Sequence, residues 1–216
     1  MIRGVPTPHP PRVPRRTQAE RRDATIAKLV DATVDSLATR GYAATSTSVV
    51  CAGAGVSQGA LFRHFPTRQD LMVATAEHVA TLDVEAFRSL LGSDVSTVEG
   101  VTATLHALRR VVLSPANQTW RELLVAARSD ADLREALRPA RESFQVRMLE
   151  VAQELWGDRL PADDLAALLS IAVNMLDGLA FSALDPDPGA PPGRTVERAL
   201  SLLARMIVDR YPQETP

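Results

Sequence analysis

The sequence is poor in cysteine, in aromatic residues and in long apolar runs. Its single cysteine excludes an intramolecular disulfide, and with it the small secreted scaffolds that disulfides hold together. No apolar run reaches the roughly 18 residues of a membrane-spanning helix. Aromatic residues make up 4% of the chain, and no alternating β-branched runs with hairpin turns are found, so an all-β fold is disfavoured. Prolines stand near the N-terminus where a signal peptide has its apolar segment, so we expect a cytoplasmic protein. Because the composition disfavours an all-β fold, we expect an all-α protein.

What the sequence does contain is enough apolar material for a large core, and an uneven distribution of charge. Of the 216 residues, 45% are hydrophobic and 23% are charged, as in soluble globular chains of one or two domains. The net charge is −2, but residues 1–80 hold ten Lys and Arg against six Asp and Glu, whereas residues 81–216 are acidic overall. This small basic excess is weak support for nucleic-acid binding, because charged faces are usually only solvated.

Residues 1–19 form a separate segment by composition. Residues 1–16 include five prolines and four arginines and have little to bury, which predicts a disordered arm. Two interpretations stay open. The arm is either an inert tail or an arginine arm that touches phosphates or enters a minor groove.

Residues 20–80 predict a small helical domain. Apolar or methyl-bearing side chains recur at the spacing of one buried helical face over residues 23–40, and Gly41 ends this helix. Thr45 or Ser46 can then cap a short second helix.

A glycine turn and a third helix follow. Gly55 allows a chain reversal with positive φ, and Ser57 can cap the next helix. Pro66 ends that helix, and Thr67 with Asp70 opens a fourth one, which is expected to lead into the rest of the chain. Two short helices joined by a tight glycine turn make a helix-turn-helix.

The short third helix has the length and the surface of a DNA-reading helix. It is roughly 12 Å long, close to the width of the major groove. Leu61 and Phe65 face inward, which leaves an outer face that is small at its front and basic behind. Gln58 can pair bidentately with adenine, Ala60 can meet a thymine methyl group, and Arg63 can take guanine or a phosphate.

The stretch GYAATSTSVVCAGAGVSQGALFRHFPTRQDL, residues 41–71, resembles the DNA-binding core of the TetR family of bacterial regulators. The resemblance implies an all-α homodimer, in which an N-terminal three-helix domain binds DNA and a larger helical domain dimerises and binds an effector. The family's usual tyrosine is Phe62 here, which has no hydroxyl to donate to phosphate. The implied DNA-binding residues are Thr45 and Thr47 at phosphate, Gln58, Gly59, Ala60 and Arg63 at bases, and His64 and Arg68 at the backbone, with Ser57 and Phe62 beside them.

Residues 81–216 predict further helices and, by the resemblance, the effector-binding and dimerisation domain. Ser96 with Glu99 predicts one helix start, and Pro139 either kinks or divides a later helix. The last two long helices are expected to pair across the dimer axis. Their expected apolar surface comprises residues 165–184 together with Leu200, Leu203 and Ile207.

Polar residues at helical spacing in an otherwise apolar helix suggest a ligand cavity. Ser170, Asn174 and Asp177 form such a stripe, although a rim or an interface stripe is the alternative interpretation. An apolar site with one acid favours a hydrophobic or weakly cationic small molecule. The candidate effector residues, each of which could instead be plain core, are Trp120, Phe144, Met148, Asn174, Met175, Asp177 and Phe181.

The sequence therefore predicts a transcriptional repressor that binds a pseudo-palindromic operator as a dimer and is released by a small hydrophobic effector. The alternative is a DNA-binding regulator whose large domain recruits a protein partner and senses nothing small. An enzyme is disfavoured, because the chain has no glycine-rich phosphate loop, no Gly-x-Ser-x-Gly elbow and no metal-ligand spacing among its four histidines and one cysteine. We expect no metal, no cofactor and no membrane association.

Overall fold

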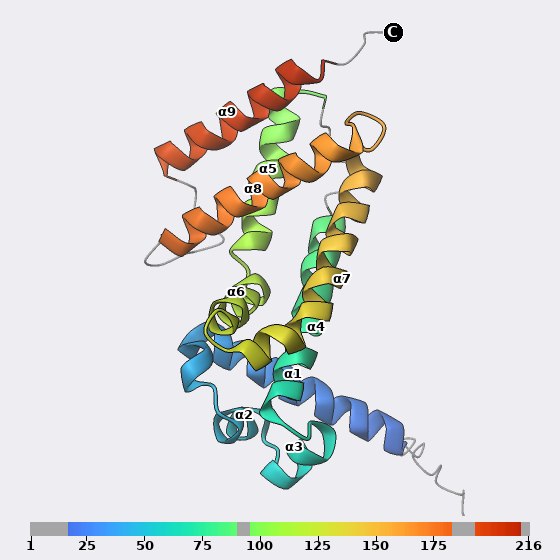
Figure 1. Ribbon diagram of the computed structural model, residues 1–216, viewed down its shortest axis with the longest axis vertical. Helices are drawn as coiled ribbons and strands as arrows, with labels where there is room; N and C mark the ends of the chain where they lie inside the picture. Colours follow the sequence, from blue (N-terminus) through green and yellow to red (C-terminus); the bar gives the residue numbers. More distant parts are fainter. Residues whose placement is uncertain (1–16, 90–95, 183–192, 213–216) are drawn as a thin grey trace, which may run out of the picture.

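The computed structural model describes residues 17–89, 96–182 and 193–212, and these residues contain helices and no strands (Figure 1). Of the expected arm, residues 1–19, residues 1–16 lie outside the described residues, whereas Thr17 caps α1 and residues 18–19 begin it. The all-α prediction is confirmed. The helices are α1 (Gln18–Ala44), α2 (Thr47–Ala54), α3 (Gln58–His64), α4 (Arg68–Arg88), α5 (Val98–Val112), α6 (Pro115–Ala127), α7 (Ala131–Trp156), α8 (Ala162–Ser182) and α9 (Arg194–Arg210).

Capping side chains start most helices where the sequence indicates. The Ser57 hydroxyl accepts a hydrogen bond from a backbone N–H in the first turn of α3. Thr67 and Asp70 form a capping box at the start of α4. The prediction for α5 was wrong by one residue, because Thr97 and not Ser96 is its N-cap. Local side-chain chemistry therefore fixes where the short helices of the N-terminal part begin.

Two glycines have positive φ, and both shape the N-terminal part of the chain. Gly55, with φ 63°, ends α2 in the left-handed conformation and makes the turn into α3. Gly41, with φ 75° and ψ 172°, interrupts α1 where the first helix was expected to end, and a short helical stretch to Ala44 follows across this kink. A β-carbon is strained in such conformations, so glycine fits both positions.

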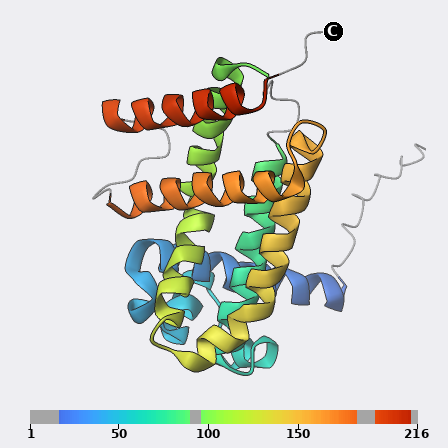
Figure 2. The same cartoon turned by 45° about the horizontal axis from the view of Figure 1, so that its top comes forward.

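The buried side chains form two clusters that meet along α4. The first joins α1, α2 and α3 with the first part of α4, most of α6 and the start of α7. The second joins the end of α4 with α5, the later part of α7, α8 and α9. After the roles that the sequence predicts for them, we call α1 to α3 with the start of α4 the reading half, and the remainder the sensor half. In Figures 1 and 2, α2 and α3 lie at one end of the molecule, and α8 and α9 lie at the other and cross α5.

The apolar residues expected on the dimer surface lie largely inside the subunit. Leu165, Leu176 and Leu200 are at most 1% exposed, because α8 and α9 turn these side chains toward the core of their own chain. Leu203 and Ile207 pack against the same core. The prediction was therefore wrong for the three buried leucines, whereas Ile171, within the expected range 165–184, is exposed. The large apolar side chains that α8 and α9 expose are Ile171, Leu202 and Met206.

Candidate DNA-binding surface and effector cavity

The helix α3 presents the residues that the sequence indicates for base contact. Leu61 is fully buried and anchors the helix on the first core cluster. Gln58, Gly59 and Arg63 are exposed, and Ala60 is half-buried. A β-carbon added at Gly59 would meet no protein atom within 4 Å. The outer face of α3 therefore carries small residues near the start of the helix and a basic residue near its end.

A shallow groove runs beside α3, between the end of α1, the start of α2 and the start of α4. Several of the expected phosphate-contacting residues line it. Phe62 is 45% exposed there. The start of α2 also opens on this groove, and the free N–H groups of a helix start favour an anion. The groove is lined by Tyr42, Ala43, Thr45, Ser46, Thr47, Phe62 and Arg68.

Two of the expected phosphate-contacting side chains already make hydrogen bonds within the protein. Thr45 is 0% exposed, and its hydroxyl donates to the Gly41 carbonyl at 2.8 Å and lies 2.9 Å from Ser36 Oγ. The burial of Thr45 contradicts the expected phosphate contact and gives this residue a packing role. Arg68 stacks 4.1 Å over the Tyr42 ring, and its Nε and Nη2 donate to the carbonyls of Thr45 and Tyr42. These bonds use two of the five N–H donors of Arg68, which leaves both N–H groups of Nη1 and one of Nη2 for a phosphate.

Two arginines that the sequence reasoning missed lie beside the recognition helix. Arg21 and Arg22 line a hollow that Arg63 and His64 also line, between the start of α1 and the end of α3. The neighbouring arginines were visible in the sequence, but only the packing of α1 against α3 brings them to the same face. Together these four side chains extend the basic surface behind α3.

A cavity of about 370 Å³ lies in the sensor half, between α4, α5, α6, α7 and α8. Its volume is in the range of pockets that hold small ligands, roughly 300–1,000 Å³. Met175 packs in the second core cluster and does not line the cavity, and the Phe181 side chain lies outside the described residues. Five of the seven candidate effector residues line it, namely Trp120, Phe144, Met148, Asn174 and Asp177.

A polar network borders this cavity, and most of it was not anticipated from the sequence. Asp83 of α4 is 2% exposed and accepts hydrogen bonds from Ser114 Oγ at 3.5 Å and Asn117 Nδ2 at 3.4 Å. Arg121 Nη1 donates to Asn117 Oδ1 at 2.8 Å and to Asp177 Oδ1 at 3.1 Å. The network thus joins α4, α6 and α8 across the cavity.

The two acids of the network have different partners. Burial raises the pKa of Asp83 to about 7, although the hydrogen bonds from Asn117 and Ser114 and the attraction of Arg121 act against it. Burial also raises the pKa of Asp177, which is opposed by its hydrogen bond and ion pair with Arg121. Among the described residues, no cation lies within ion-pair distance of Asp83. Asp83 is therefore a buried acid without a positive partner.

The helix α6 connects this cavity with the reading half. Thr119 Oγ1 donates to the Val34 carbonyl at 3.2 Å, and Glu122 Oε2 accepts from the Tyr42 N–H at 3.2 Å. Both acceptor and donor on the far side belong to the main chain of α1. A shift of α6 would therefore pull directly on the main chain of α1.

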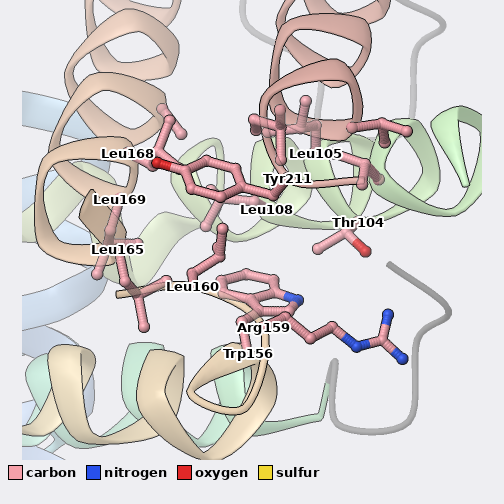
Figure 3. A pocket seen from close by; sticks show the side chains of 14 residues that line it. Thr104, Leu105, Leu108, Trp156, Arg159, Leu160, Leu165, Leu168, Leu169 and Tyr211 are labelled. Carbon is pink, nitrogen blue, oxygen red and sulfur yellow. The ribbon is translucent and has the colours of Figure 1, made fainter. Parts of the chain in front are cut away.

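A second cavity, of about 70 Å³, lies between α5, the end of α7, α8 and α9 (Figure 3). Its walls are mostly aliphatic, with the rings of Trp156 and Tyr211 beside them, and the Arg159 guanidinium points away from it. Tyr211 Oη donates to Asp164 at 2.6 Å. Because this volume is well below that of a pocket for a drug-sized ligand, the larger cavity is the better candidate for an effector.

In the described ranges, no three His, Cys, Asp or Glu side chains come together as metal ligands would. No helix there has the length and apolar content needed to cross a membrane.

Residues 29–75 match the family described as bacterial regulatory proteins, tetR family. An uncharacterised HTH-type transcriptional regulator of Mycobacterium tuberculosis is 35% identical over 167 residues, which cover 77% of this chain and 86% of the relative. The chain belongs to the tetR family. An HTH-type transcriptional repressor of the same species is 29% identical over 180 residues, 81% of this chain and 93% of the relative.

Solved tetR-family structures share the fold. A putative tetR-family regulator from Mesorhizobium loti superposes with a TM-score of 0.70 at 16% identity, covering 89% of this chain and 99% of that one. The multidrug binding protein EbrR, solved with imidazole, superposes with a TM-score of 0.59 at 22% identity, covering 97% and 100%. The assignment to this family from residues 41–71 is confirmed, and with it a helix-turn-helix transcriptional regulator. The tetR family is one of regulators and not of enzymes.

Proposed function

We propose that the protein is a tetR-type repressor that binds a pseudo-palindromic operator as a homodimer and is released by a small molecule in the 370 Å³ cavity. The observation that carries this proposal is the position of α6. On one side Asn117 and Arg121 of α6 line the cavity, and on the other Thr119 and Glu122 hydrogen-bond to α1. A ligand that moves α6 would move the reading half with it.

The proposed DNA contacts follow from exposure. Gln58, Gly59, Ala60 and Arg63 face the bases from the outer side of α3. The backbone contacts, in which Thr45 takes no part, come from Thr47, Ser57, Phe62, His64, Arg68 through Nη1, and the newly found Arg21 and Arg22.

The release mechanism requires two subunits. Operator half-sites about 34–36 Å apart accept one spacing of the two recognition helices. A ligand that favours another spacing must lower operator affinity, by about 5- to 150-fold for a typical coupling of 1–3 kcal/mol. Linkage is reciprocal, so operator DNA must lower ligand affinity by the same factor.

Three measurements test this function. Footprinting on the DNA upstream of the protein's own gene should protect a two-fold symmetric site. A thermal-shift screen over metabolites and drugs should then find a ligand that stabilises the protein. That ligand is titrated with and without saturating operator. Equal ligand affinities in the two titrations would favour the alternative, a regulator whose large domain recruits a protein partner.

A further inference from the structure

We propose that the ligand of the 370 Å³ cavity is an organic monocation with an apolar body, and that the Asp83 carboxylate holds its positive group. This inference rests on the proposed function, because it names the ligand class of the same effector cavity. It adds a recognising residue that lies on α4 and not on the α8 stripe expected from the sequence.

The first observation is that Asp83 lines the cavity without a positive partner. Its carboxyl is 2% exposed, and its two donors, Asn117 and Ser114, are neutral and lie at 3.4 and 3.5 Å, the long end for hydrogen bonds. A buried carboxylate is stable only when it is paired or well hydrogen-bonded. A ligand cation would supply the missing pair.

The second observation is how the other charges around the cavity are arranged. Arg121 of α6 is already neutralised by Asp177 of α8, at 3.1 Å. Arg141 of α7 is an exposed lining residue, so water screens its charge. Arg147 of α7 reaches α4 at Thr81, which lies on another face of that helix from Asp83. Of the charged groups that line the cavity, Asp83 is therefore the one that is buried and has no ion pair, so the uncompensated buried charge is negative.

The third observation is the lining available to the rest of the ligand. The rings of Trp120 and Phe144 line the cavity with their centroids 5.3 Å apart. Aromatic faces attract cations as well as apolar groups. Leu169 and Val173 of α8 add aliphatic surface. An aromatic or branched aliphatic amine fits this combination of one acid and an apolar wall.

Binding of a cation to Asp83 should depend on pH, whereas simple apolar binding should not. A cation binds the ionised form of Asp83, whose pKa is about 7 in the free protein. Raising the pH from 6 to 8 ionises the carboxyl before the ligand arrives, so affinity for a permanently protonated amine should rise about tenfold over this interval. A neutral ligand should bind equally at both pH values.

The test uses three probes of nearly equal shape on the full-length protein: 4-tert-butylbenzylamine, 4-tert-butylbenzyl alcohol and 4-tert-butylbenzoate. Calorimetry at pH 6, 7 and 8 measures their affinities. We expect the amine to bind at least tenfold more tightly than the alcohol at pH 8, and the benzoate to bind more weakly than either.

Two variants locate the effect. Asp83→Asn keeps the size and hydrogen-bonding capacity of the side chain and should remove both the preference for the amine and its pH dependence. Glu85→Gln removes a charge from an exposed position on the same helix and should keep both. Melting curves without ligand confirm that both variants are folded.

The following outcomes would contradict the inference. Tighter binding of the benzoate or the alcohol, or an amine preference that survives Asp83→Asn, overturns the cation assignment and leaves an effector cavity in place. Binding of none of the three probes overturns the assignment too. The proposed function is judged separately, by operator footprinting, so its failure is not confused with this one.

Discussion

Asp83 is held almost entirely out of water, and this should be measurable in the stability of the ligand-free protein. Its pKa is about 7 in the fold and about 3.9 in an unfolded chain, so the unfolded state ionises first as the pH rises. The contribution of Asp83 to stability is therefore greatest below about pH 4 and falls up to about pH 7. We predict that Asp83→Asn is more stable than the wild type at pH 8, by up to about 4 kcal/mol, and similar near pH 4. Urea unfolding at both values measures this, with Glu85→Gln as the control, and equal stabilities at pH 8 would contradict it.

Gln58, at the exposed start of α3, should act on one base pair alone. We predict that Gln58→Ala lowers discrimination at a single position of each half-site by about 1–3 kcal/mol, because it removes a bidentate base contact. Competition binding against operators with single base changes measures this. Gln153→Ala, on the exposed face of α7, is the matched control. A uniform loss over all operator variants would show that Gln58 does not read bases.

Among the helices, two glycines near the ends of α1 and α3 should respond to alanine in opposite directions. Gly41→Ala forces a β-carbon into a glycine-type conformation, 3.1 Å from Glu122 Oε2, and should cost about 1–3 kcal/mol. Gly59→Ala adds a methyl group to a helix in open space and should stabilise the protein by up to about 1 kcal/mol. Chemical unfolding tests both. A loss of operator affinity in the more stable Gly59→Ala would support close approach of α3 to DNA, and unchanged affinity would argue against it.

The helix α6 should transmit the ligand's effect through Glu122. We predict that Glu122→Ala, which removes the acceptor of the Tyr42 N–H, reduces the factor by which ligand weakens operator binding. Glu122→Gln keeps an acceptor at this position and should retain most of the coupling. Paired titrations of ligand with and without operator measure the factor, and an unchanged factor in Glu122→Ala would exclude this route.

The sequence predicts features that depend on neighbouring residues, but not features that depend on how two helices pack against each other. The start of α3 at Ser57 follows from a single cap and is read directly. The burial of Thr45 does not, because it depends on α1 and on the Arg68 guanidinium, which are distant along the chain. Asp83 looks like an ordinary solvated acid in its own helix. Only the packing of α6 against α4 makes it a buried group on a cavity wall.

For the whole molecule, the exposed apolar residues of α8 and α9 should decide assembly. We predict that Met206→Glu, at a side chain 67% exposed in the subunit, weakens the dimer and lowers operator affinity at least tenfold, because two half-sites need two subunits. Analytical ultracentrifugation and operator titration measure the two effects. Val146→Glu, at an apolar residue on α7 that is 57% exposed, should leave the dimer intact. A dimer that resists Met206→Glu would place the interface elsewhere.

The two hydrogen bonds from α6 to α1 end on main-chain atoms, the Val34 carbonyl and the Tyr42 N–H. Every residue that can occupy positions 34 and 42, apart from proline at position 42, offers the same atoms. The side chains of the reading half can therefore change toward a new operator without removing the atoms that these two hydrogen bonds use. Recombination that exchanges one reading half for another could preserve responsiveness in a single step, so a chimera of this sensor half with a relative's reading half should inherit the relative's operator and keep this protein's inducer.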